Sequence, residues 1–152
     1  MGTEMEKPQK MMLSIDKAIE LELINSGVRT ALKEFWKWFA PRYATPYAMS
    51  ADVELDTNHL SLHIYYDVTE KVDECIFDCV EQTKKYINKV DENKIEESCQ
   101  GGCFYDVAAY ANAMFDDIRE KLFKCLDKYS IKYSWKEGWV DNSKYLQVDI
   151  FS

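Results

Sequence analysis

A strict alternation of apolar and polar residues between positions 49 and 68 constrains this chain more than any other feature. Apolar side chains fill the odd positions of 49–55 and the even positions of 60–68, and the polar pair Thr57-Asn58 separates the two runs. Successive side chains of a β-strand point to opposite faces of its sheet. The pattern therefore predicts an antiparallel hairpin with one apolar face and one polar face.

A loop at Thr57 and Asn58 also fixes the register of this hairpin. The expected pairs on the apolar face are Leu55–Leu60, Val53–Leu62 and Ala51–Ile64, and those on the polar face are Asp56–His59 and Asp52–His63. A His–Asp pair resembles part of an acid–base relay, but no nucleophile accompanies these pairs in the sequence. We therefore interpret them as solvated pairs across two strands.

Three other stretches repeat apolar residues at the spacing of an amphipathic helix. The expected helices cover residues 14–39, with Ser14 as N-cap, residues 69–90, with Thr69 as N-cap, and residues 104–129. Pro41 is expected to end the first helix, and Gly27 marks a point where it kinks or splits. Residues 91–98 are expected to form a loop or a frayed helix end, and residues 99–103 a tight turn.

A second alternation near the C-terminus predicts another hairpin, with strands around 131–135 and 146–150. Its connecting loop, residues 137–143, carries Trp139 at an exposed position. The element order is then α-ββ-α-α-ββ, an α+β fold whose antiparallel four-stranded sheet of two hairpins is covered by helices. The length suits one domain at residues 13–152, preceded by a flexible leader at residues 1–12.

Four of the five cysteines form two pairs, each with three intervening residues. They are Cys75 and Cys79, and Cys99 and Cys103. Four thiols can hold zinc tetrahedrally, which makes these four the candidate metal ligands. Disulfides between the two segments would instead staple them together, and a third interpretation is simple burial as small apolar side chains. The N-terminus lacks an apolar signal segment, so mostly reduced thiols in a cytoplasmic protein are expected.

Aromatic side chains are abundant, with ten Tyr, seven Phe and four Trp. Residues 35–39 hold four rings around one lysine, and a helix cannot turn all four inward because successive residues differ by ~100°. At least one of the two tryptophans there belongs at the edge of the core or outside it. The candidate partner-binding residues are Trp36, Trp38, Tyr43, Tyr47 and Trp139. The competing interpretation is that the segment 41–47 caps these rings.

The charge balance is acidic, with 27 Asp and Glu against 19 Lys and Arg and a net charge of −8. This sign argues against nucleic acid and against an anionic membrane surface as partners. It suits a basic protein partner, or solubility alone. The sequence also lacks a glycine-rich phosphate loop and the common hydrolase and metalloprotease motifs, and we expect no cofactor.

These features favour a non-enzymatic protein-binding protein. The expected type is a small acidic inhibitor of another protein, such as an immunity or anti-defence protein, with a basic partner. Two alternatives stay open. One is an acidic dimeric chaperone or adaptor, which keeps a homodimer in view, and the other is a cysteine-based zinc-binding module.

Overall fold

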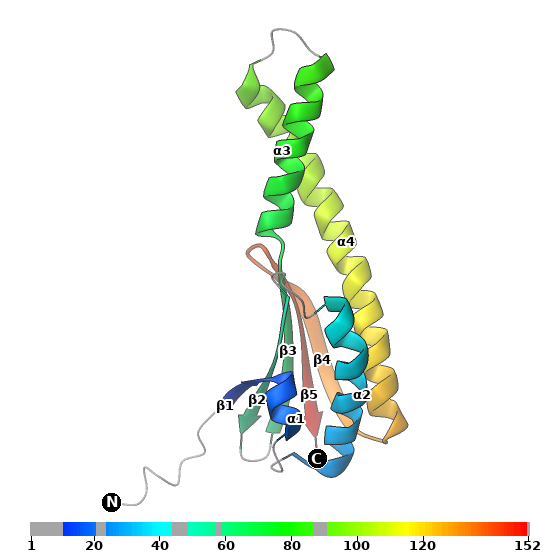
Figure 1. Cartoon of the computed structure of the whole chain (residues 1–152). Helices are drawn as coiled ribbons and strands as arrows, with labels where there is room; N and C mark the ends of the chain where they lie inside the picture. The colour runs from blue at the N-terminus through cyan, green and yellow to red at the C-terminus, as the bar shows by residue number, and fades with distance from the viewer. Residues whose placement is uncertain (1–10, 21–23, 44–48, 57–58, 87–90, 152) are drawn as a thin grey trace, which may run out of the picture.

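The computed structural model of this chain describes residues 11–20, 24–43, 49–56, 59–86 and 91–151. Its helices are α1 (Ile15–Glu20), α2 (Ser26–Tyr43), α3 (Thr69–Tyr86) and α4 (Glu92–Lys128). Its strands are β1 (Met11–Ser14), β2 (Met49–Asp56), β3 (His59–Asp67), β4 (Lys132–Val140) and β5 (Ser143–Phe151). The strands form one end of the molecule, and α3 rises beyond them beside the first half of α4 (Figure 1).

The strands pair in one antiparallel sheet with the order β1-β2-β3-β5-β4. The register of β2 and β3 is the one expected from the alternation, with Val53 opposite Leu62 and Asp52 opposite His63. Strand β5 joins the two hairpins by placing Val148 opposite Leu62. The antiparallel α+β class is therefore confirmed, because the apolar alternation determined the pairing.

The expectation of four strands is wrong, because the sheet has five. Strand β1 pairs with β2 and sets Leu13 opposite Val53. Four residues are too few for a period of two to stand out, and α1 follows immediately at Ile15. Met11 and Met12 thus belong to the sheet, whereas the rest of the expected leader lies outside the described residues.

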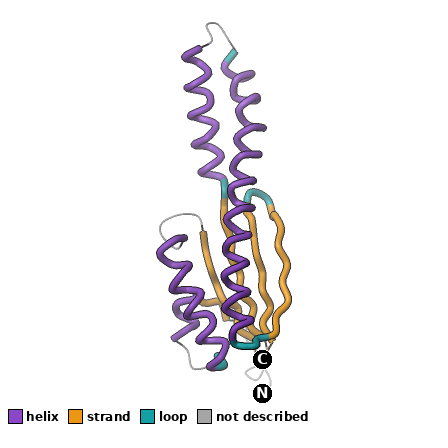
Figure 2. The backbone as a smooth tube through the Cα atoms, turned by 90° about the vertical axis from the view of Figure 1, so that its right-hand side faces the viewer, coloured by secondary structure: helices purple, strands orange, loops and turns teal. Residues whose placement is uncertain are grey.

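One face of the sheet is covered by α1, α2 and the C-terminal half of α4 (Figures 1 and 2). The largest fully buried side chains are Phe35, Phe39, Phe115, Ile15, Leu32, Leu62, Ile64, Ile118, Leu122, Leu126, Leu146 and Val53. Along β5, buried positions alternate with partly exposed ones. The second face of the sheet is polar, and no described helix covers it.

The first expected helix is divided into α1 and α2, but the break lies before Ser26, and Gly27 is the second residue of α2. The expectation that Pro41 ends it is wrong, since α2 continues through Pro41 to Tyr43. Proline has no backbone N–H, so the Lys37 carbonyl cannot accept the usual helical bond from residue 41, and α2 ends two residues after Pro41. The Arg42 guanidinium donates a hydrogen bond to the carbonyl of Trp38, one turn earlier in α2, at 2.7 Å.

The expected loop or frayed helix end at 91–98 and the turn at 99–103 are also wrong, because α4 runs unbroken from Glu92 to Lys128. Ile95, Cys99 and Cys103 recur every four residues and are all buried. That spacing keeps them on one face of the helix, toward α3. We call α3 together with residues 92–110 of α4 the arm. It projects past the end of the sheet as an antiparallel helical pair (Figure 2).

The second β-hairpin also differs from its expected form. Strand β4 extends to Val140, so the connection is the two-residue turn Asp141-Asn142 rather than a loop over residues 137–143. Asp141 has a φ of 53°, a conformation that Asp tolerates better than most residues. Trp139 consequently lies in a strand and packs, partly buried, against the core. No described helix is long and apolar enough to cross a membrane.

Candidate functional site

The arm leaves the sheet through a short capped junction. The Asp67 carboxylate accepts hydrogen bonds from the backbone N–H and the hydroxyl of Thr69, at 2.9 and 2.6 Å. These bonds lower the pKa of Asp67 and satisfy a free N–H in the first turn of α3. The amide of Val68 donates to the carbonyl of Asn142, which ties the junction to the β4–β5 turn. The arm therefore begins from a fixed point on the sheet.

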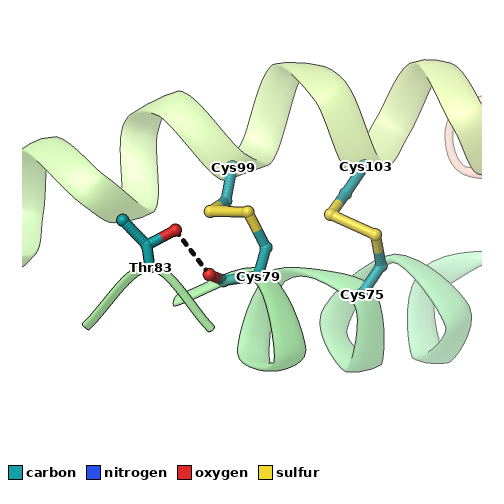
Figure 3. The surroundings of a disulfide bond; sticks show 5 residues. All are labelled: Cys75, Cys79, Thr83, Cys99 and Cys103. Carbon is teal, nitrogen blue, oxygen red and sulfur yellow. Dashed lines mark hydrogen bonds between the residues drawn. A yellow bond between two sulfur atoms is a disulfide. The ribbon is translucent and has the colours of Figure 1, made fainter. Parts of the chain in front are cut away.

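Two disulfides join the helices of the arm, as Figure 3 shows. Cys75 pairs with Cys103 and Cys79 pairs with Cys99, with Cα–Cα distances of 5.6 and 5.9 Å. Because the partners on each helix are four residues apart, both bridges form on facing sides of the two helices. The structure thus brings the four candidate metal ligands together. They form two disulfides between the helices, which was one of the alternatives to a zinc site.

Paired sulfurs have no thiolate to offer a zinc ion. Among the described residues, no group of three or more His, Cys, Asp and Glu is arranged to hold a metal. The expectation of mostly reduced thiols also differs from the structure, because four of the five cysteines are paired. The fifth, Cys125, is free and buried, and burial raises the pKa of its thiol.

The staple supplies cohesion that packing in the arm does not. Helix α3 has no buried side chain along its 18 residues. The bridges close loops with sequence separations of 28 and 20 residues, and in the chain-entropy model each cross-link of this size stabilises by roughly 3 kcal/mol. Near the tip, the ion pair between Lys84 and Glu92 spans 2.8 Å, raising the pKa of the lysine and lowering that of the carboxylate.

Gly101 and Gly102 lie inside α4 between the bridged cysteines, and a Cβ at either would meet nothing within 4 Å. Packing does not demand glycine here, and glycine disfavours a helix by roughly 1 kcal/mol relative to alanine. We expect Gly101→Ala to stabilise the arm by ~0.5–1 kcal/mol, measured as slower amide exchange across residues 96–106. Gly138→Ala is the matched control, because its Cβ would lie 3.1 Å from the Tyr145 hydroxyl oxygen. Equal stabilisation by both would contradict this.

Exposed aromatic rings concentrate on the arm. Five of the eight exposed large aromatic side chains in the described part of the chain lie there: Phe77, Tyr86, Phe104, Tyr105 and Tyr110. Phe77 is 66% exposed and Tyr105 is 76% exposed. Phe77 is two residues from both Cys75 and Cys79, so helical spacing turns it ~160–200° away from the bridged side. It has no role in joining the two helices.

One side of the arm carries an apolar stripe. Ile76 and Val80 each follow a bridged cysteine of α3, and Phe104 follows Cys103 of α4. Because the helices are antiparallel, a step of ~100° past the cysteines leads to the same side of the pair on both. Ile76 and Val80 are partly buried, while Phe104 is exposed. These three residues therefore form an accessible apolar strip.

Acidic residues outnumber basic ones along the arm. The sequence from residue 69 to residue 110 holds ten Asp and Glu against five Lys, and no Arg. The arm thus carries most of the net charge of −8. Carboxylates in this number favour a cationic surface as the complement of the arm.

A pocket of about 270 Å³ lies where the arm meets the sheet and α2. Its lining residues are Arg42, Tyr43, Met49, Tyr66, Lys71, Tyr110 and Met114. Burial is the largest cause of the raised pKa values of Tyr43 and Tyr66. Lys71 and Tyr110 also line a second hollow with Asp106 and Val107. The foot of the arm, where it meets the sheet and α2, therefore has two adjoining pockets lined by aromatic rings and cationic side chains.

The aromatic residues proposed from the sequence have separate places. Trp36, Trp38 and Tyr43 are partly buried and pack against the core, with the ring centroids of Trp38 and Tyr43 5.8 Å apart. The expectation that Trp36 or Trp38 sits at the core edge is confirmed, and only Tyr43 also lines the foot pocket. Trp139 lies on the face of the sheet that the helices cover and packs against the core. Tyr47 lies outside the described residues. The structure does not gather the four described residues of this set into one patch.

The two histidines lie on the open face of the sheet. His59 and His63 stand opposite Asp56 and Asp52 in the register, as expected. Their side chains also lie 3.3 Å from Asp149 and from Glu54, respectively. The hydroxyl of Ser61 donates to Asp149 at 2.7 Å. Asp149 is thus held between Ser61 and His59, and the serine is a donor to the carboxylate rather than an activated nucleophile.

The exposed rings of the arm are not indicated by the sequence pattern. The helical repeat of apolar residues in 69–90 predicts the side of the helix that packs inward. Phe77 lies between Cys75 and Cys79 in the sequence and is therefore on the opposite side of the helix. Comparison of the chain with protein-family models, with curated proteins and with solved structures finds no match. The site therefore has to be interpreted from its geometry.

Proposed function

We propose that this chain is a non-enzymatic protein-binding protein that presents the arm to a basic partner and inhibits it. The observation that carries this proposal is the placement of exposed rings on a disulfide-stapled helical pair whose sequence is rich in acidic residues. Phe77 and Phe104 are the proposed anchors, since large rings in desolvated contacts dominate many interfaces. An inhibitor needs a rigid surface of this kind and no reacting groups.

Electrostatics would add rate and selectivity to that contact. The ten carboxylates of residues 69–110 attract a cationic surface from a distance and disfavour an acidic one. The anchors then pack once the partner has docked. The association rate should consequently fall as salt is added, while the dissociation rate depends on the rings.

Site-specific photo-crosslinking tests this proposal. A photoreactive phenylalanine analogue at position 77 or 104 is expected to capture one protein of high isoelectric point in cells of the native host. The same analogue at Tyr65, which is exposed on the open sheet face, is the control and should not capture it. Capture at 65 alone would refute the arm as the binding element, and capture of a second copy would favour a homodimeric adaptor instead.

The captured protein then allows a quantitative comparison. We expect Phe77→Ala and Phe104→Ala each to weaken its binding at least ~10-fold, because buried ring anchors are commonly worth more than about 1.4 kcal/mol. Tyr65→Ala should leave the affinity unchanged. Each replaced residue is exposed, so thermal stability should change little. Equal affinities for all three variants would contradict the proposal.

A further inference from the structure

We infer that the two disulfides form a thiol–disulfide exchange site whose redox state decides whether the arm is folded. With both bridges closed, the arm is a rigid helical pair. With both open, α3 separates from α4 and loses its helical structure while the sheet and its helices stay folded. The consequence for binding rests on the proposed function, because the same arm carries the proposed contact residues.

The packing of the arm supports this inference. Helix α3 has no buried residue, and the buried residues of α4 within the described arm are Ile95, Cys99 and Cys103. Two of those three are bridge partners. Once the bridges open, the apolar contact left between the helices is too small to offset the entropy of ordering them.

The rest of the molecule does not depend on the arm. None of the described buried residues of the main core lies between positions 69 and 110, because the cluster passes from Val68 directly to Ala111. Within the described arm, the partly buried apolar side chains that pack against that core are Val72 and Val107, both near its junction with the sheet, where Lys71 and Tyr110 also line the pocket shared with Tyr66 and Met114. The arm can therefore unfold as a separate unit without opening the core.

The bridges can be reached from one side. Cys75 and Cys79 on α3 are partly exposed, whereas Cys99 and Cys103 on α4 are each 4% exposed. A thiolate of an external dithiol can attack the α3 sulfur, breaking the S–S bond and releasing the α4 cysteine as a thiolate that takes up a proton. The second thiol of the dithiol then displaces the α3 cysteine. Two electrons pass per bridge, leaving two protein thiols and an oxidised dithiol.

This chemistry links the arm to its surroundings. Disulfides persist in oxidising compartments and are opened by dithiol systems in reducing ones. The protein would carry its binding surface in the first and lack it in the second. The free thiol of Cys125 takes no part, because it is buried in the main core.

Hydrogen exchange of the full-length protein tests the inference without any partner. We compare amide protection in the disulfide form with that after reduction by dithiothreitol. Reduction is expected to lower protection in 69–86 and 95–106 on the order of 100-fold, the effect of losing even one such cross-link. Protection in β3 and in residues 111–128 should stay within a few-fold. Changing all four bridge cysteines to Ser should reproduce this pattern in air, and Cys125→Ala should not.

Two results would overturn the inference: an arm that keeps its protection after reduction, or an arm and core that lose protection together. Binding is then measured separately, by crosslinking from position 104 with and without dithiothreitol. If reduction abolishes capture of the partner, the redox state of the two disulfides controls binding by the arm. If reduction melts the arm but capture persists, the redox site stands and the proposed function of the arm fails.

Discussion

Replacing Leu62 by Asp is expected to abolish cooperative folding. Leu62 is fully buried in β3, near the middle of the sheet, where it faces Val53 on one side and Val148 on the other. An aspartate there has no cation to pair with, and burying an unpaired charge costs several kcal/mol. Loss of the leucine packing adds roughly 2–5 kcal/mol. The sum is comparable to the ~5–15 kcal/mol that hold a domain together.

Circular dichroism during thermal and urea denaturation measures this effect. Tyr65→Asp is the control, because Tyr65 lies on the same strand but is 38% exposed on the open face. That variant should lose only its ring contacts with His63 and Tyr145 and keep a cooperative transition. A Leu62→Asp protein that melts cooperatively near the wild-type temperature would mean that the alternation had been assigned to the wrong face.

The accuracy of the β-sheet expectation has a physical cause. If the register of β2 and β3 slipped by one residue, every apolar side chain of one strand would point to the solvent-exposed face. With apolar residues at each alternate position, a single register is much lower in free energy than its neighbours. The pairing of Val53 with Leu62 therefore follows from the alternation of residues alone.

The sequence pattern predicts the sheet but not the arm, because the arm depends on contacts between distant residues. Its helices are held by cross-links, and a sequence shows the spacing of cysteines but not their partners. Gly101 and Gly102 favour a turn on local propensity, yet the repeat Ile95–Cys99–Cys103 and the bridges to α3 override that preference. The exposed rings of the arm could not be located for the same reason, because their faces depend on one continuous helix.

Long-range contacts also decide where Trp139 lies. The turn formers Gly138 and Asp141-Asn142 suggest a wide loop, but the tightest turn lets β4 pair with β5 up to Val140. Trp139 then faces the core, with the Lys144 ammonium 5.7 Å from the centre of its ring. No local pattern indicates such a buried lysine, because its partners come from α4 and β4.

Replacing Glu137, the ion-pair partner of Lys144, by Leu is expected to destabilise the protein strongly. Lys144 is 6% exposed, and its ammonium lies 3.2 Å from the Glu137 carboxylate. The same carboxylate accepts a hydrogen bond from Arg119 at 2.6 Å. Removing one partner of a buried ion pair leaves an uncompensated charge, which typically costs ~3–5 kcal/mol. Glu137→Leu should therefore lower the free energy of unfolding by about 3 kcal/mol, measured by urea denaturation.

Two further variants separate the charge effect from ordinary surface electrostatics. Glu120→Ala breaks the exposed pair of Lys124 and Glu120, whose side chains are 71% and 66% exposed, and should cost at most ~0.5 kcal/mol. The double variant Glu137→Leu/Lys144→Met removes both buried charges and should be more stable than Glu137→Leu alone, because apolar side chains can replace a buried pair at little cost. Arg119 keeps Asp116 as a partner in that variant, at 2.7 Å. A double variant as unstable as the single one would show that lost packing around β4, rather than the unpaired ammonium, causes the destabilisation.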